Sequence, residues 1–391
     1  MITIVKQKIK IIFIFFFFAF FTLSLIIKTR NFPSYRDEEV YINCGVSYIL
    51  NATPPLLCNF EHPPLGKYII GFAEIYGFSR IFYLLLYYAS TLIVFLVVLK
   101  LTSSYVASLL ASLLLYFDTI FYNTHRYLLL DPLAVFFTLL AVYTYLTRHY
   151  YISAVVAGLA VASKFSSLPV ILAIFLLTWR SSGFKRAVVY AVIALLVYLL
   201  TFTSDLQLGW DAIIRHHVEI YRYLSWRHGF SIPIAVNGFL KLIVKLELWR
   251  YIGEVQVYVD TVARSVVNQT FIPIGKSLLV INIGAGSIVW YALLPLLLYA
   301  TYRALVKPGE IALQVLVLFS WFSLVNILAG PIDWYYVNCL PYLYMTMSTL
   351  LQRTLSVNTL KTTTWILVTI GVGIYYLVVL GLIPFRLIVL Y

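Results

Sequence analysis

Three consecutive carboxylates stand early in the chain, in the segment Tyr35-Arg36-Asp37-Glu38-Glu39-Val40-Tyr41. A carboxylate that faces water is ionised at neutral pH, so it can take a proton from a hydroxyl group as a general base. A structural interpretation competes with this one, because acidic residues also cap helix N-termini in solvated loops. The triplet leaves open whether Asp37 or Glu38 would carry the chemistry.

The second segment with chemical potential is Phe60-Glu61-His62-Pro63-Pro64-Leu65-Gly66-Lys67. The two prolines have fixed φ angles and stiffen the backbone, so His62 is presented just ahead of a helix that we expect to begin near Leu65. Lys67 then lies in the first turn, where the helix dipole opposes a cation, so a bound anion such as phosphate would stabilise it. The alternative is an interfacial lysine that reaches the lipid headgroups.

Further polar clusters occur at the ends of apolar runs. Arg126 and Asp131 are about a turn and a half of helix apart, and Lys164 stands between two apolar segments. Near the C-terminus, Pro331-Ile332-Asp333-Trp334-Tyr335-Tyr336 occupies another helix end, although its aromatic residues also fit an interfacial belt. Each cluster has a structural alternative, but four clusters on one face favour a shared site.

The composition shows what must position these residues. Of 391 residues, 62% are hydrophobic and 11% are charged, with a mean hydropathy of +0.93. A soluble chain carries roughly 25% charged residues, so a single soluble domain is excluded. The net charge of +13 does not indicate nucleic-acid binding, because Lys and Arg stand at the ends of apolar runs, as in bilayer-spanning chains.

Apolar runs long enough to approach a bilayer span recur along the whole chain, and we count about eleven of them. They lie near 11–27, 81–99, 103–121, 127–147, 152–163, 169–179, 187–203, 277–301, 311–329, 337–351 and 362–382. The two runs within 152–179 are either short spans or one interrupted hairpin. No small-residue cleavage site follows the first run, so we expect a retained span. The sequence predicts one all-α polytopic membrane domain, residues 1–391, with long loops at about 28–80 and about 204–276.

Charge sets the expected orientation of this multi-pass chain. Alternate short loops collect the basic residues Lys6, Lys8, Lys10, Lys100, Arg148, Arg180, Lys185, Arg186, Arg303, Lys307, Arg353 and Lys361, with Glu310 as the one carboxylate. By the positive-inside rule that side is cytoplasmic and contains the N-terminus. The external side then receives fourteen of the fifteen Asp and Glu residues. Any active site is therefore expected on the external face of the cell membrane.

The three cysteines allow two readings. Cys44 and Cys58 lie in the same loop and can pair if that loop faces an oxidising space, which leaves Cys339 over, or all three are thiols. No metal-binding spacing is present. A divalent cation held by Glu61, His62 or His228 stays an open alternative, and the metal entry for this chain is unknown.

Taken in order, these motifs resemble a known family. Asp37-Glu38-x-x-Tyr41, then His62-Pro63-Pro64-Leu65-Gly66-Lys67, then Arg126 with Asp131-Pro132, then Gly158-Leu159-Ala160-x-x-Ser163-Lys164, are similar to the dolichyl-phosphate-mannose protein mannosyltransferases. The lipid A aminoarabinose transferases are similar in the same places, and both belong to the GT-C class of membrane glycosyltransferases. The resemblance covers roughly residues 1–180, with a looser echo at 333–341.

The resemblance implies a GT-C fold with amphipathic helices at the external interface. It also implies a polyprenyl-phosphate sugar donor, mannose by default, and a protein or lipid acceptor. Asp37 takes the position of the catalytic carboxylate with Glu38 beside it, and Asp131 matches the second acidic position. Lys67, Lys164 and Arg126 would hold the donor phosphate, and the site-shaping motif residues are His62, Pro63, Pro64 and Tyr41.

The residue types fit this chemistry on their own terms. Sugar transfer from a lipid phosphate needs a base near the acceptor hydroxyl and cations on the departing phosphate. The chain departs from the eukaryotic mannosyltransferases in having no room for their large inserted soluble domain. Its loop 205–276 is instead helical and aromatic, contains His216 and His217, and is expected to cover the site.

Two other function classes compete. A secondary transporter with an external charged vestibule would place charged residues along several spans, whereas these spans are nearly free of charge at their centres. A non-catalytic assembly subunit would not need Asp37. The oligomeric state, the sugar and the acceptor type are not determined by the sequence.

Overall fold

The computed structural model describes residues 36–228, 257–258, 271–274, 277–280, 290–326, 336–364 and 366–367. All of them belong to one compact unit, residues 36–391. The helices of the first half are α2 (Arg36–Leu50), α3 (Leu65–Ile75), α4 (Ser79–Thr102), α5 (Tyr105–Tyr116), α6 (Thr119–Arg126), α7 (Leu130–Leu146), α8 (Tyr150–Ser163), α9 (Leu168–Ser182), α10 (Phe184–Leu200) and α11 (Ala212–His228). Short 3-10 turns η1 (Pro55–Leu57), η2 (Phe165–Ser167) and η3 (Thr203–Leu208) connect some of them. The C-terminal third contributes α13 (Trp290–Val306), α14 (Ile311–Leu324) and α16 (Leu340–Thr354).

The described residues also include a small antiparallel sheet, which departs from the all-helical expectation. Its strands are β1 (Val257–Tyr258), β2 (Phe271–Ile274) and β3 (Ser277–Val280), in the order β1-β3-β2. The predicted span 277–301 is therefore corrected, because its first residues pair as a strand and its helix begins only at Trp290.

The lengths of the helices qualify the expected count of spans. Within the described ranges, Ser79–Thr102 and Phe165–Ser182 are long and apolar enough to cross a membrane, and Tyr105–Tyr116 with Ile120–Arg126 passes as one broken span bent by 64°. Shorter apolar helices are Leu130–Leu146, Tyr150–Ser163, Ala292–Val306 and Ile311–Leu324. The predicted run 11–27 and most of 362–382 lie outside the described residues.

Asp118 explains why the predicted span 103–121 is broken. Its side chain accepts a hydrogen bond from the Phe121 amide (2.9 Å), which is the N-cap arrangement that begins a new helix. The Tyr344 hydroxyl on α16 donates to the other oxygen of the same carboxylate at 2.7 Å. A fully buried carboxylate thus ends α5 and fastens α6 to the C-terminal third.

The first predicted loop is a folded helical hairpin. Helix α3 begins at Leu65 as expected, and Lys67 lies in its first turn. Its backbone touches that of α2, because a Cβ on Gly45 would lie 2.0 Å from the Lys67 carbonyl oxygen. A disulfide between Cys44 and Cys58 ties the connecting segment to α2, so the pairing alternative is confirmed. Cys339 is free and buried.

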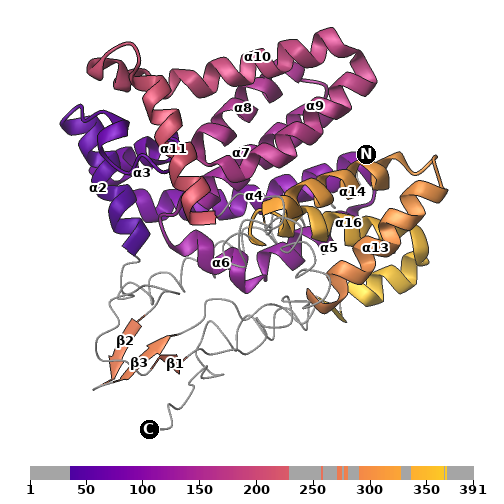
Figure 1. Ribbon diagram of the computed structural model, residues 1–391. Helices are drawn as coiled ribbons and strands as arrows, with labels where there is room; N and C mark the ends of the chain where they lie inside the picture. The colour runs from indigo at the N-terminus through magenta and orange to yellow at the C-terminus, as the bar shows by residue number, and fades with distance from the viewer. Residues whose placement is uncertain are drawn as a thin grey trace. The chain divides into compact units, whose positions relative to one another are not determined.

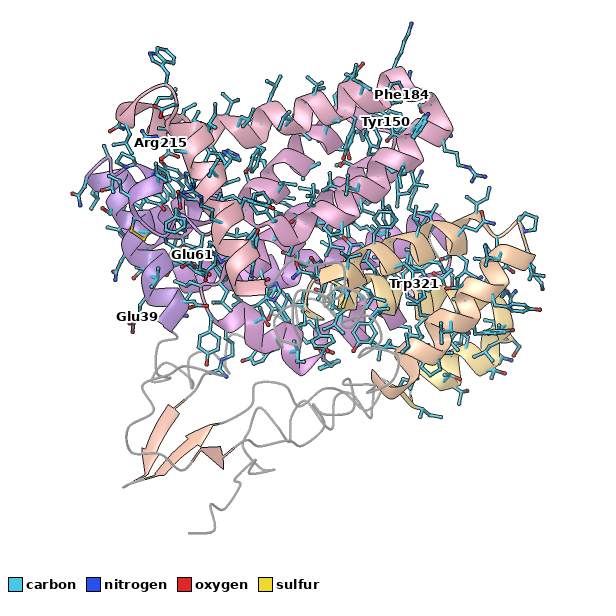
Figure 2. All side chains as sticks on the ribbon, viewed as in Figure 1. Glu39, Glu61, Tyr150, Phe184, Arg215 and Trp321 are labelled. Atoms are coloured by element: carbon cyan, nitrogen blue, oxygen red, sulfur yellow. A yellow bond between two sulfur atoms is a disulfide. The ribbon has the colours of Figure 1, made fainter. Side chains whose placement is uncertain are left out.

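Charged groups separate toward opposite ends of the packed helices α7 to α10, which run side by side (Figure 1). Asp131 at the start of α7 meets Lys164 just after α8, so the turn with Arg148 between these helices lies at the other end. There the Arg186 guanidinium stacks on Tyr150. Figure 2 shows Tyr150 and Phe184 at the end of the α8–α10 pair far from Glu61.

Glu310 was the one carboxylate expected among the cytoplasmic basic residues. It accepts hydrogen bonds from the Arg303 guanidinium at 2.6 to 2.9 Å. Arg303 also donates to the Arg353 carbonyl oxygen at 3.3 Å, which brings α13 and α16 together. The exception to the charge pattern is thus a neutralised ion pair among the basic helix ends.

Candidate active site

Adjacent carboxylates of α2 have different surroundings. Glu38 is fully buried, accepts a hydrogen bond from the Leu128 amide (3.0 Å) and forms an ion pair with Arg80. Asp37 is half-buried in the same turn, and Glu39 is exposed at the end of the helix (Figure 2). Successive helical residues project about 100° apart, so one carboxylate can enter the protein while its neighbours stay near the surface.

Arg80, at the start of α4, is a site residue that the sequence analysis missed. Besides its pair with Glu38, its guanidinium donates to the Arg126 carbonyl oxygen at 2.8 Å. Arg126 is itself partly buried, and its guanidinium lies 5.8 Å from the centre of the Tyr122 ring. Two cations therefore flank the segment that joins α6 to α7, and both are partly accessible.

The segment 127–129 is extended and is held by side chains from other elements. The Tyr83 hydroxyl donates to the Leu129 carbonyl oxygen at 2.6 Å, while Glu38 holds the Leu128 amide. Helix α7 then begins with Asp131 and Pro132 in its first turn. A proline is tolerated there because the first amides of a helix have no intrahelical acceptor, and a carboxylate is favoured by the helix dipole.

Asp131 is buried and meets Lys164 with a distance of 2.6 Å between carboxylate oxygen and ammonium nitrogen. Its other oxygen accepts from the Asn338 side-chain amide at 3.2 Å. Asn338 in turn accepts from the Ser166 hydroxyl (3.2 Å), and Asn326 donates to the Ser166 carbonyl oxygen at 2.9 Å. Asn326 and Asn338 were not singled out from the sequence, since an isolated asparagine carries no motif.

These contacts bring together residues from five parts of the chain. We call them the carboxylate network: Glu38, Arg80, Arg126, Asp131, Lys164 and Asn338. The predicted residues Glu38, Arg126, Asp131 and Lys164 thus share one region with Asp37 beside it. Asp333, Trp334 and Tyr335 lie outside the described residues, but Asn338 shows that the stretch following them reaches the network.

Lys67 occupies a second polar region. Its ammonium is fully buried and donates to the carbonyl oxygens of Asn59 and His62, the latter at 3.0 Å, and to the Asn59 side chain at 3.3 Å. Burial lowers the pKa of Lys67 to about 7, against the opposing influence of Glu61 and Asp205. The side chain expected to hold a phosphate is therefore occupied in closing the turn at residues 59–62.

His62, Pro63 and Pro64 connect this region to α2. The two prolines are buried, and the His62 ring meets the Tyr41 ring edge-on with 6.1 Å between centroids. Tyr41 lies one helical turn beyond Glu38. The two polar regions are thus neighbours along α2, and the predicted site-shaping residues form the link.

Asp205 and His216 form a buried pair that the sequence analysis did not assign. A carboxylate oxygen of Asp205 in η3 lies 2.6 Å from Nδ1 of His216 in α11, and both side chains are fully buried. Nε2 of His216 lies 3.1 Å from the Phe60 carbonyl oxygen, and the Leu56 amide donates to Asp205 at 2.9 Å. The second predicted loop therefore packs on the first, as expected for a cover.

Across the described ranges, no group of three or more His, Cys, Asp or Glu side chains is arranged to hold a metal ion. The side chain of His228 lies outside what the structure describes.

Comparison with known proteins identifies a fold class. No family model matches the sequence, and no curated protein matches it. Among solved structures, the match is to a GT-C membrane glycosyltransferase, which supports a membrane protein of that fold.

The matched structure is ArnT from Cupriavidus metallidurans, a lipid A aminoarabinose transferase, bound to undecaprenyl phosphate. The TM-score is 0.50 at 16% sequence identity, and the match covers 94% of this chain but only 63% of ArnT. The likeness at this identity concerns the fold, and the chain spans less than two thirds of its neighbour's length.

Proposed function

We propose that this protein is an integral membrane glycosyltransferase that transfers a sugar from a polyprenyl-phosphate donor to a hydroxyl group of a protein or lipid. Mannose is the default sugar, from the motif resemblance, and the external membrane face is the expected site of transfer. The observation that carries the proposal is the convergence of carboxylates and cations from α2, α4, α6, α7 and the 164–166 turn at one end of apolar helices. ArnT, which has the same fold, was solved with a polyprenyl phosphate.

We assign the general base to Asp37 rather than to Glu38. Glu38 is buried and already engaged by Arg80 and by the Leu128 amide, so an acceptor hydroxyl has little access to it. Asp37 sits in the same turn and retains partial exposure. A base has to come within hydrogen-bonding reach of the proton it removes, which favours the accessible carboxylate.

The cations are assigned by the same reasoning. Arg126 and Arg80 are partly accessible beside the network, so they are placed to meet the donor phosphate. Lys164 is neutralised by Asp131, and its proposed role is to set the position of that carboxylate. Lys67 can reach a phosphate only if the turn at 59–62 opens, because three oxygen acceptors surround its ammonium.

In the proposed reaction, Asp37 takes the proton of the acceptor hydroxyl as its oxygen bonds to the anomeric carbon of the sugar. The bond between that carbon and the phosphate oxygen breaks, and the polyprenyl phosphate leaves with the electron pair. Negative charge grows on the phosphate as it departs, so the arginines stabilise the transition state more than the ground state.

The test is sugar transfer by the purified protein in lipid, from radiolabelled polyprenyl-phosphate mannose to a pool of Ser/Thr peptides and glycolipids. Asp37→Asn should abolish transfer, while the exposed neighbour variant Glu39→Gln should retain it. Label in one acceptor class would also identify the acceptor. Absence of label with mannose and with other polyprenyl-phosphate sugars would overturn the proposal and return weight to a transporter or an assembly subunit.

A further inference from the structure

The buried pair of Asp205 and His216 has a proton inventory that its geometry determines. Nδ1 of His216 faces a carboxylate oxygen at 2.6 Å, and Nε2 faces the Phe60 carbonyl oxygen at 3.1 Å. Neither partner can donate a hydrogen bond, so both ring nitrogens must carry a hydrogen. His216 is then an imidazolium, and the pair is a buried ion pair.

The neighbouring His217 provides the contrast. Its Nδ1 lies 2.7 Å from the Ile213 carbonyl oxygen, but its Nε2 lies 2.8 Å from the Tyr198 hydroxyl, which can donate. A neutral imidazole satisfies both of these contacts. Two adjacent histidines of α11 therefore differ in charge because of what their second nitrogen meets.

The ion pair holds the segment that leads into the predicted motif. Asp205 accepts from the Leu56 amide, and His216 donates to the carbonyl of Phe60, directly before Glu61 and His62. Lys67 holds the same turn from α3 through the Asn59 and His62 carbonyls. The segment 55–62 is thus gripped on one side by α3 and on the other by η3 and α11.

We propose that Asp205 and protonated His216 are positioning residues that fix the segment 55–62, and with it His62 and the turn around Lys67, for the transfer reaction. The inference about activity rests on the proposed function, whereas the inference about charge and position does not. The groups around the pair are Lys67 and Tyr68 on α3, Tyr48 on α2, Glu61 in the turn and His217 on α11. Asp205 and Glu61 are the anions among them, and they favour a cation at His216.

The position of the segment predicts what its release would do. Without the His216 proton, the contact to Phe60 loses its donor, and a buried carbonyl is left without a partner. The turn can then open away from α11, although Lys67 and the Cys44–Cys58 disulfide still hold its inner side. Release would expose backbone amides of residues 55–62 and displace His62.

The first measurement is the side-chain ¹⁵N spectrum of the full chain, labelled at histidine and held in lipid nanodiscs at pH 7. His216→Gln and His217→Gln assign the two signals. We expect protons on both nitrogens of His216 and on one nitrogen of His217. A His216 signal with one bare nitrogen would overturn the proposal.

The second measurement is hydrogen exchange of the segment 55–62 in the same preparation. We expect amides of this segment to exchange at least tenfold faster in His216→Gln, with His217→Gln unchanged. In Asp205→Asn the His216 proton loses its carboxylate, so protection should disappear at lower pH than in the wild type. Equal protection in His216→Gln and wild type would overturn the clamp.

The transfer assay then separates this inference from the proposed function. If the wild type transfers sugar, His216→Gln should lower kcat/KM at least tenfold, and the activity of Asp205→Asn should decline at lower pH than that of the wild type. If the wild type transfers nothing, the proposed function fails while the spectrum and the exchange rates still decide the clamp. Full activity of His216→Gln at all pH values would remove the positioning role.

Discussion

The carboxylates Asp37 and Glu38 show how much one residue step changes on a helix. Glu38 enters the protein and is neutralised by Arg80, while Asp37 stays half-buried and Glu39 is exposed. Burial likewise separates the lysines, because Lys164 faces a carboxylate and Lys67 faces only neutral oxygen atoms within hydrogen-bonding distance. Charge in this region is therefore matched group by group, which makes single substitutions informative.

Glu38→Gln tests the division of roles between the two carboxylates. The substitution removes the ion pair with Arg80 but keeps an oxygen for the Leu128 amide, so we expect a loss of stability of about 1–2 kcal/mol, discounted because Arg80 is half exposed. Thermal unfolding should show a lower Tm with transfer activity retained in part. Glu39→Gln is the control and should unfold like the wild type. A Glu38→Gln protein that folds normally but is as inactive as Asp37→Asn would identify Glu38 as the base.

Lys67 predicts a pH dependence of stability. Burial lowers its pKa to about 7 in the folded protein from an ordinary value of 10.5, so between these pH values the unfolded chain binds more protons. Stability should therefore rise with pH from about 7 to 10, by up to about 1.4 kcal/mol per pH unit, and this gain is lost as pH falls through 7. Tm measured against pH for wild type and Lys67→Met checks this, since the variant should lack the rise. Parallel curves for the two proteins would contradict the prediction.

At the scale of elements, the α2–α3 hairpin is built by close backbone contact. A Cβ on Gly71 would lie 2.1 Å from the backbone carbon of Gly45, so neither helix can carry a side chain at the crossing. The Cys44–Cys58 disulfide and the buried prolines complete a rigid unit that presents Asp37 and His62 from opposite helix ends. The expected loop is thus an ordered part of the site.

Gly45→Ala should disrupt this hairpin. The added methyl group would meet the Lys67 carbonyl oxygen, a backbone atom that cannot move alone, so we expect a loss of about 1–3 kcal/mol or more and a weaker turn around Lys67. Gly309→Ala is the matched control, because its new Cβ meets no atom within 4 Å. Thermal unfolding of both variants checks the contrast. Equal Tm values would show that the helices separate readily.

At the scale of the whole molecule, the described helices divide their charges between two ends. The carboxylate network lies at one end of α7 and α8, and the basic turns with Arg148 and Lys185 lie at the other. This is the arrangement of a membrane enzyme whose chemistry occurs at one interface. It also fits the disulfide, because disulfides persist outside the cytosol.

Cysteine labelling in intact cells tests the orientation. We expect Glu39→Cys, at the end of the carboxylate network, to react with a membrane-impermeant maleimide added outside. Lys185→Cys is equally exposed and should react only after the membrane is permeabilised. The native Cys339 is buried and gives little background. The reverse pattern would place the carboxylate network in the cytoplasm.

Local patterns in the sequence determine much of this protein. The membrane class, most helix positions, the start of α3 at Leu65 and the four predicted network residues Glu38, Arg126, Asp131 and Lys164 follow from apolar run length, proline position and motif order. These features depend on neighbouring residues, so one chain without its fold contains them.

Only the tertiary structure decides which groups meet. The break of α5 at Asp118, the choice of Arg80 as partner of Glu38, the contact of Asn338 with Asp131 and the pairing of Asp205 with His216 join residues 11 to 226 positions apart. Arg80, Asn338 and Asp205 have no motif around them, because their role arises from the packing of distant helices. Burial decides the protonation of Lys67 for the same reason, since desolvation depends on the whole surrounding fold.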